Sequence, residues 1–435
     1  MTGSLDRYVA EAERFDAQRR GDPEWLRRAR KDGLERFQRL GFPTTRDEEW
    51  RFTSVAPIAE SRFELPSDGV SSLASADLGP FEWRGRFAAT LVFANGRYAA
   101  GVSDVGGLPA GVRVESLARA LGRPAAPLEA HLARVGALDR RPFTALNTAF
   151  LGDGALIEVP ASTIVPSPIH VLFVSVGEER APMIHPRVLV IMGAGSRATI
   201  VESYGAVAAE RYFTNGVTEI VVGENAALDH YKVQREAPSS FHVGAMYARA
   251  ARDARLACHS ISLGGSLVRN DVHVVLDGEG ATATLNGLYL GDGSRLVDNH
   301  TTIDHARPHC DSREVYKGIL ADRARAVFNG KIVVRPDAQK TDAKQTNKAL
   351  LLSEEAHINT KPELEIFAND VKCTHGAAIG QIDEEAIFYL RARGLGQQQA
   401  RHVLIRAFAA DVLSQMPLEP VGSRIDEELS RRLPE

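Results

Sequence analysis

Hydrophobic residues at the start of the chain recur at helical spacing. Leu5, Tyr8 and Ala12 are three to four residues apart, which gathers their side chains on one face of an α-helix. Gly41 follows the last residue of this periodic pattern, as is typical of a helix C-terminus. The pattern therefore predicts a helical segment over residues 1–53.

The next two segments differ in their patterns of apolar residues. Residues 54–160 mix short apolar runs with helical patterns, and we expect a mixed α/β connection that leads into the core. Over residues 161–382, β-branched runs such as Ile169–Val174 and Val188–Met192 are separated by Gly, Asn and Asp. Short runs of this kind, bounded by turn residues, are typical of strands. The segment therefore predicts a β-rich core without a long helix.

Short look-alike sequences recur within this β-rich core. Their central residues are His230, His259, Asn286, Asn329 and His375, at successive offsets of 29, 27, 43 and 46 in residue number. Such a period indicates a solenoid, and we interpret the two larger offsets as about two short coils. We therefore predict a mainly β fold built on a right-handed parallel β-helix. In this fold Asn286 and Asn329 would form hydrogen-bonded ladders at corners, where asparagine tolerates left-handed backbone.

The pattern turns helical again over residues 383–435. Asp383–Glu385 supply an acidic first turn, which is favourable beside the partial positive charge of a helix N-terminus. An apolar stripe at helical spacing begins near Gln397. A stack of β-coils leaves open strand edges only at its two ends, so the two terminal helical segments are candidate covers for those ends.

Composition describes an ordinary globular protein. The chain has 435 residues, more than one compact domain usually holds, with 25% charged residues and a net charge of -4. This charge gives no general affinity for nucleic acid. Three cysteines far apart in the sequence argue for a reducing compartment, and we expect the cytoplasm. The sequence has no basic-apolar leader and no apolar run of about 18 residues, so we expect neither secretion nor a membrane span.

Metal chemistry is suggested by Cys373 and His375. Side chains at i and i+2 of a strand point to the same side, so this pair would present a sulfur and a nitrogen ligand together. Thiolate with imidazole suits iron, zinc or copper. One Cys and one His do not complete a mononuclear site, so a structural role is the alternative. The adjacent pairs Cys258–His259 and His309–Cys310 face opposite sides of a strand, and we interpret both as structural.

Longer strings of residues resemble a known family. The chain is similar to the SufB and SufD proteins of the SUF iron-sulfur cluster assembly system along the segments Asn329–Ile332, Asp337–Ser353, Thr360–Ile366, Asp370–Gly376 and Gly380–Gly394. Gly41–Thr53 and the Cys373-Thr374-His375 form of the site resemble the SufD branch. An N-terminal cysteine cluster, found in many SufB proteins, is absent.

The resemblance implies a scaffold subunit and not an enzyme. It implies pairing with SufB through the β-helix regions, binding of the ATPase SufC, and a transient iron-sulfur cluster at the interface with SufB. His375 would be the leading cluster ligand on this chain, with Cys373 beside it. The matching SufC-binding positions are Phe388, Tyr389, Leu390, Arg393 and Gly394.

Several alternatives stay open at this point. The chain has no Gly-x-x-x-x-Gly-Lys-Ser/Thr loop, so we expect nucleotide to bind SufC and not this chain. Whether a reduced flavin binds the assembled complex is undecided, as is pairing of two copies of the isolated chain through the SufB-binding surface. One competing function is a purely structural adaptor without a cluster ligand. Another is a β-helix carbohydrate-active enzyme, which the scattered charges and the lack of a secretory leader disfavour.

Overall fold

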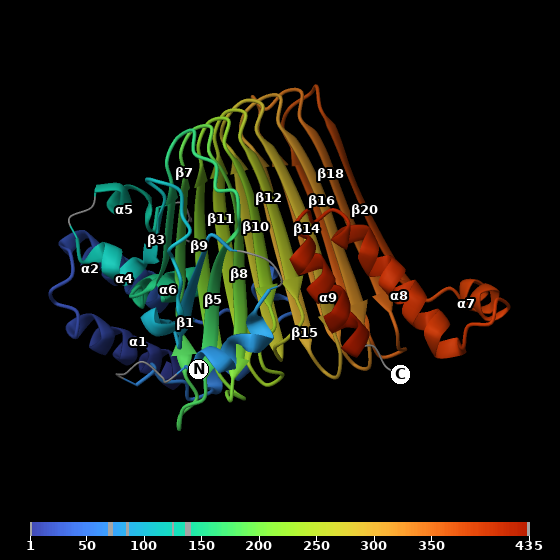
Figure 1. Ribbon diagram of the computed structural model, residues 1–435, viewed down its shortest axis with the longest axis horizontal. Helices are drawn as coiled ribbons and strands as arrows, with labels where there is room; N and C mark the ends of the chain where they lie inside the picture. The colour runs from blue at the N-terminus through green and yellow to red at the C-terminus, as the bar shows by residue number, and fades with distance from the viewer. Residues whose placement is uncertain (1, 68–72, 84–86, 124–125, 135–140, 433–435) are drawn as a thin grey trace.

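Two long β-sheets lie face to face in the computed structural model, which describes residues 2–67, 73–83, 87–123, 126–134 and 141–432. From residue 187 onward the chain alternates between the sheets, so each coil adds one strand to each (Figure 1). Neighbouring strands of the stack are parallel. The structure is thus the mainly β, parallel β-solenoid that the sequence predicts.

The first sheet contains ten strands. In spatial order they are β2 (Arg97–Tyr98), β1 (Ala89–Ala94), β5 (Ile169–Val176), β8 (Arg197–Val207), β10 (Ala227–Gln234), β12 (Arg255–Ser262), β14 (Thr282–Gly291), β16 (Asp311–Leu320), β18 (Asp342–Leu351) and β20 (Lys372–Gln381).

The second sheet lies opposite. Its strands are β3 (Arg113–Ser116), β4 (Gly154–Val159), β7 (Arg187–Met192), β9 (Phe213–Val222), β11 (Phe241–Ala250), β13 (Leu267–Leu276), β15 (Leu296–His305), β17 (Arg325–Val334) and β19 (His357–Ile366), with β6 (Met183–Ile184) paired to β9.

Helices lie before and after the stacked strands. They are α1 (Thr2–Ala17), α2 (Glu24–Leu40), α3 (Ala56–Glu60), α4 (Leu117–Leu121), α5 (Ala126–His131), α6 (Pro142–Ala149), α7 (Glu384–Arg391), α8 (Gln397–Leu413) and α9 (Glu419–Arg432), with 3-10 turns η1 (Glu48–Trp50), η2 (Ser75–Phe81) and η3 (Ala100–Val102). Gly41 ends α2 at a φ of 67°, as the sequence predicts.

The strand register sets the true length of a coil. Asn286 pairs with His259, 27 residues earlier, and Gln345 pairs with Glu314, 31 residues earlier. The offsets of 43 and 46 residues therefore correspond to one and a half coils each, and not to the predicted two. Each of these steps leads to a strand of the opposite sheet. The predicted corner ladder of Asn286 and Asn329 is wrong for this reason. Asn286 lies within β14 of the first sheet and Asn329 within β17 of the second.

The corners are made by other residues. At each of the six passages from the second sheet to the first between β7 and β18, one residue has left-handed backbone. These residues are Gly195, Asn225, Asp253, Gly280, His309 and Lys340, with φ between 54° and 71°. Each donates its amide to a carbonyl of the next coil, as Asn225 does to Arg252 at 2.9 Å. Stacked corners of this kind fix how one coil sits on the next.

Alternating side chains fill the space between the sheets. Inward residues such as Leu285, Phe328 and Ile303 are fully buried and belong to one apolar cluster that runs through the stack. Alternation follows from the period of two along a strand, which sends every second side chain inward. Burial of this apolar surface, at about 25 cal/mol per Å², is the main stabilising term of the stack.

Helices cover the outer faces of both sheets. Helices α1, α2 and α6 gather near the β1 and β3 end, and their apolar side chains pack with Phe213 and Phe241 of the second sheet (Figure 1). Helix α8 packs on β14 and β16 of the first sheet, through Ile405, Ala409 and Val412. The C-terminal helices thus lie on a face and not over an end of the stack, which differs from the expected end cover.

Helix α9 lies within the predicted helical segment of residues 383–435, and its Val421, Ile425 and Leu429 recur every four residues and are buried. None of the helices among the described residues combines the length and apolar character needed to cross a lipid bilayer.

Candidate functional site

The solenoid ends in an open coil formed by β19 and β20. Each of these strands is the last of its sheet, with a neighbouring strand on one side only among the described residues. Inward positions that are buried in earlier coils are therefore uncovered here. Ile379 of β20 is 49% exposed, and Ile366 of β19 is 39% exposed although its register partner Val334 is fully buried. Exposed strand edges with apolar neighbours are features of a surface that another chain can cover.

Cys373 and His375 lie on β20 of this open coil. Cys373 aligns with Ala343 of the preceding coil and His375 aligns with Gln345. Both alignment partners are inward side chains that are 1% exposed. The structure therefore places Cys373 and His375 on the same inward side of the strand, at the mouth of the solenoid.

The two side chains differ in their surroundings. His375 is exposed, whereas Cys373 is half-buried and packs with Ile332 and Ala343 in a small apolar cluster. Burial, helped by the nearby carboxylate of Asp342, raises the pKa of the Cys373 thiol. The thiolate is the form that binds metal, so in this coil the imidazole is the more available ligand.

A polar row continues behind His375 into the interior. The Gln345 Nε2 donates a hydrogen bond to Oε2 of Glu314, one coil further in, at 2.7 Å. Burial raises the pKa of Glu314 to about 7, although the nearby Thr301 hydroxyl and the hydrogen bond from Gln345 act to lower it. The row Glu314, Gln345 and His375 thus leads from a buried acid to an exposed imidazole.

Helix α7 projects from the side of the molecule near this end (Figure 1). Its N-cap Asp383 accepts a hydrogen bond from the Glu385 amide at 2.9 Å, which fits the predicted acidic first turn. Ile387 is 3% exposed and anchors the helix in the cluster that includes Leu350.

The opposite side of α7 is apolar and uncovered. Phe388 and Tyr389 are 72% and 57% exposed, whereas Leu390 packs against the protein. The Arg393 guanidinium lies 3.5 Å from the centroid of the Tyr389 ring, and Gly394 ends the turn at a φ of 94°. Four of the five predicted partner-binding residues therefore face outward.

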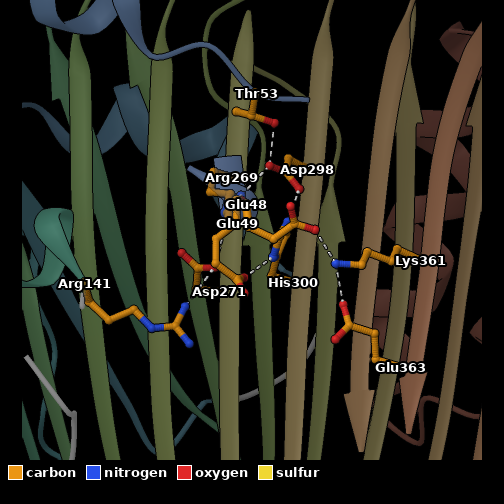
Figure 2. A network of polar contacts seen from close by, with 10 residues as sticks. All are labelled: Glu48, Glu49, Thr53, Arg141, Arg269, Asp271, Asp298, His300, Lys361 and Glu363. Carbon is orange, nitrogen blue, oxygen red and sulfur yellow. Dashed lines mark hydrogen bonds and ion pairs between the residues drawn. The ribbon is translucent and has the colours of Figure 1, made fainter. Parts of the chain in front are cut away.

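A network of charges joins residues 44–53, here named the strap, to the outer face of the second sheet (Figure 2). Arg269 of β13, 1% exposed, donates to Asp298 at 2.6 Å and to the Glu49 carbonyl at 2.7 Å. Its guanidinium also lies 4.1 Å from the centroid of the Trp50 indole. A buried cation thus holds both the backbone and a side chain of the strap.

His300 is bonded on both ring nitrogens within this network. Its Nδ1 lies 3.1 Å from Glu49 and its Nε2 lies 3.0 Å from Asp298. Burial and the charge of Arg269 act to lower the pKa of His300, but the two carboxylates outweigh them and raise it. Further along, Lys361 of β19 pairs with Glu48 at 2.6 Å, so the strap also reaches the open coil (Figure 2).

The two other Cys-His pairs lie in different settings, and only Cys258–His259 lies on a strand as predicted. Cys258 lies in the interior cluster, while its neighbour His259 faces the other side and stacks on Tyr231 at 4.4 Å. His309 forms a left-handed corner and Cys310 is buried. Over the described residues, no group of three or more His, Cys, Asp or Glu side chains is arranged to hold a metal ion.

Sequence reasoning missed Glu314 and Gln345 as companions of His375. A signal for them exists, because in-register residues recur once per coil. Gln345 precedes His375 by one coil, and Glu314 precedes Gln345 by one more. This signal becomes readable only once the coil length is known.

Comparison with known families matches nearly the whole chain. Residues 173–408 match the family described as SUF system FeS cluster assembly, SufBD core domain, and residues 9–171 match the SufBD protein N-terminal region.

Relatives of similar length extend this match. An iron-sulfur cluster assembly SufBD family protein of Synechocystis is 35% identical, over 90% of this chain and 88% of the relative. The iron-sulfur cluster assembly protein SufD of Escherichia coli is 33% identical, over 92% of each chain. The SufD protein of Bacillus subtilis is 26% identical, over 95% of each.

Proposed function

Because the chain belongs to the SufBD family of the SUF iron-sulfur cluster assembly system, we propose that it is a SufD-type scaffold subunit without catalytic activity of its own. In this proposal it joins SufB and the ATPase SufC in the cytoplasm, and a nascent iron-sulfur cluster forms where it meets SufB. The cluster is cargo that the assembly builds and releases. Three free cysteines are consistent with a reducing compartment.

One observation carries the proposal, which is the position of His375. Its imidazole belongs to an inward row, yet it is exposed because β20 is the last strand of its sheet. A ligand at an open end can bind a cluster that a second subunit encloses, with the remaining ligands supplied by that subunit. Cys373 lies two residues away on the same side and is the second candidate ligand.

Anaerobic reconstitution tests this role of His375. The SufB-SufC-SufD assembly carrying His375→Ala should form much less cluster than the unchanged assembly, as measured by absorbance and by iron and sulfide content. His357→Ala is the matched control, because His357 is an exposed histidine of the same open coil on β19. Equal cluster yield in the two variants would favour an adaptor without a cluster ligand.

The open coil is also the proposed SufB-binding surface. Its support is the pair of strand edges together with the exposed side chains of Ile366, Phe367 and Ile379. Ile379→Asp should weaken SufB binding by at least tenfold in calorimetric titration, because a carboxylate would be buried without a partner. Ile164→Asp is the control, since Ile164 is 59% exposed and lies far along the stack. Light scattering of the isolated chain will show whether two copies pair through the same surface.

The outward side of α7 is the proposed SufC-binding surface. Phe388 and Tyr389 offer exposed aromatic area of the kind that dominates binding energy at interfaces. If ATP-driven dimerisation of SufC moves α7, the shift would reach the open coil through the chain that joins them, residues 381–384. Phe388→Asp should abolish co-purification with SufC while Ile164→Asp leaves it intact. Normal co-purification of the Phe388 variant would reject this surface.

A further inference from the structure

A buried amide oxygen lies without a partner beside the candidate ligand. Gln345 is 1% exposed, and its Oε1 accepts no hydrogen bond within the described part of the chain. Buried side-chain acceptors are satisfied in the large majority of cases, because an unpaired one costs roughly 1–3 kcal/mol. We therefore expect a hydrogen-bond donor for the Oε1 of Gln345.

The amide of Gln345 is held from two sides. Its Nε2 donates to the Glu314 carboxylate at 2.7 Å, which fixes the nitrogen toward the interior. Gly330 of the opposite sheet approaches so closely that a Cβ at this position would overlap the same nitrogen. Because Gln345 is clamped between these residues, its oxygen is a fixed feature of the site and not a freely rotating group.

His375 is the neighbour of Gln345 on the coil side away from Glu314. The two residues are paired in register on β18 and β20, where adjacent strands are about 4.8 Å apart. Within the described residues no hydrogen bond holds the imidazole, so its ring is free to turn toward the amide. A neutral imidazole has one N-H donor and one nitrogen with a free lone pair.

We propose that Gln345 is a positioning residue for His375: its Oε1 accepts the ring N-H, and the other ring nitrogen is left with its lone pair directed out of the open coil. This inference rests on the proposed function of His375 as a cluster ligand. Docking of the partner subunit favours the bond, because it removes the water that otherwise satisfies the imidazole N-H. An acceptor behind a metal-binding histidine fixes its tautomer and raises its basicity, and removing such an acceptor typically costs 10–100-fold in metal affinity.

Cobalt binding to the assembled apo complex tests the proposal without using cluster assembly as the readout. Gln345→Met keeps the shape of the side chain and removes the acceptor. We expect the Kd for Co²⁺, followed by visible absorbance, to rise roughly 10–100-fold. Gln345→Glu restores an acceptor oxygen, because one of the two adjacent carboxyls keeps a proton, and should bring the Kd back to within about threefold of the unchanged complex.

A matched control lies two residues away on the same strand. Asn347 is also 1% exposed with an unpartnered amide oxygen, but it aligns with Ala377 and not with a histidine. Asn347→Leu should leave Co²⁺ affinity unchanged. Thermal unfolding of each variant separates loss of affinity from loss of fold.

Failure of the inference is distinguishable from failure of the proposed function. If His375→Ala leaves Co²⁺ affinity unchanged, the role of His375 as a ligand is wrong. If His375→Ala weakens binding while Gln345→Met does not, the positioning role alone is wrong. Should Gln345→Met fail to assemble, a folded Gln345→Glu complex that also binds Co²⁺ weakly would overturn the positioning role.

Discussion

The two ends of the solenoid differ in the strands that form their edges. At the first end, β2 and β3 pair antiparallel with β1 and β4, and helices α2, α4 and α5 bury Leu156 and Leu189 on the neighbouring face. At the last end, β19 and β20 continue the parallel stack and then stop with their inward side chains uncovered.

Because of this difference, one end of the solenoid is suited to stability and the other to recognition of a partner. The short strands β2 and β3 offer little edge for another chain to pair with, whereas the ten-residue edges of β19 and β20 are templates for such pairing. Contacts within the chain therefore cover the first end and the outer faces, whereas the candidate ligand lies at the end where a partner can reach it. Four sets of variants test this contrast, in order of decreasing expected effect.

Variants in the charge network that holds the strap should lower the free energy of unfolding most. Arg269→Ala leaves Asp298 buried without its cation, and removing one partner of a buried pair costs about 3–5 kcal/mol. Lys361→Ala breaks the strap contact at the open coil, where the side chain of Lys361 is 43% exposed, and should cost less than about 1 kcal/mol. Urea unfolding gives both values. Equal losses would mean that the strap is held as firmly at the open coil as at β13.

Truncation of apolar side chains should have the second-largest effect, and this effect should differ between the two ends of the solenoid. Leu189 is fully buried under the helices, and Leu189→Ala should lower the free energy of unfolding by about 2–5 kcal/mol. Ile379→Ala at the open coil should lower it by no more than about 0.5 kcal/mol, because Ile379 is already 49% exposed. Chemical denaturation of both variants measures the contrast. A large loss for Ile379→Ala would show that the open coil is part of the stabilising core.

Glu314 should make stability depend on pH in the unusual direction for a carboxyl group. Burial raises its pKa from 4.5 to about 7, so between these values the folded chain holds a proton that the unfolded chain releases. Stability contributed by this group is present below pH 4.5 and is lost as the pH rises toward 7, by an amount on the order of 3 kcal/mol. Glu314→Gln should remove this dependence. The melting temperature of both proteins is measured from pH 4 to pH 8. If it changes with pH in the same way in both, the assignment to Glu314 is wrong.

His300 should give the smallest effect, confined to the strap. The carboxylates of Glu49 and Asp298 raise its pKa, so its stabilising charge is present below the pKa of an unfolded histidine and is lost as the pH rises through the folded value. Trp50 fluorescence should therefore report loosening of the strap as the pH rises through the raised pKa of His300. His300→Gln should abolish this step. A step that survives the substitution would have to come from another group.

Much of the architecture was readable from local patterns. The end of α2 at Gly41, the start of α8 at Gln397 and the β-coils followed from a glycine stop, helical spacing and short β-branched runs. Each of these signals lies within a few residues, where backbone preference and side-chain period act directly. The coil length was misread because the look-alike sequences at Asn286 and Asn329 belong to opposite sheets, and sequence similarity does not record which sheet a strand joins.

The candidate site was readable only in part. The i and i+2 spacing placed Cys373 and His375 on one side of a strand, and the family resemblance drew attention to α7. The exposure of His375 and its alignment with Gln345 required the register between coils, and the strap network required contacts such as Glu48 with Lys361, 313 residues apart.

By itself, the sequence determined the family, the repeating strands and the residue types able to bind metal, because each is written in short stretches of chain. Only the tertiary structure decided that one end of the stack stays uncovered, that Gln345 lies behind His375, and that Arg269 fixes the strap. The physical reason is that stacking and charge pairing join residues through space, so their partners are set by how the coils align and not by distance along the chain.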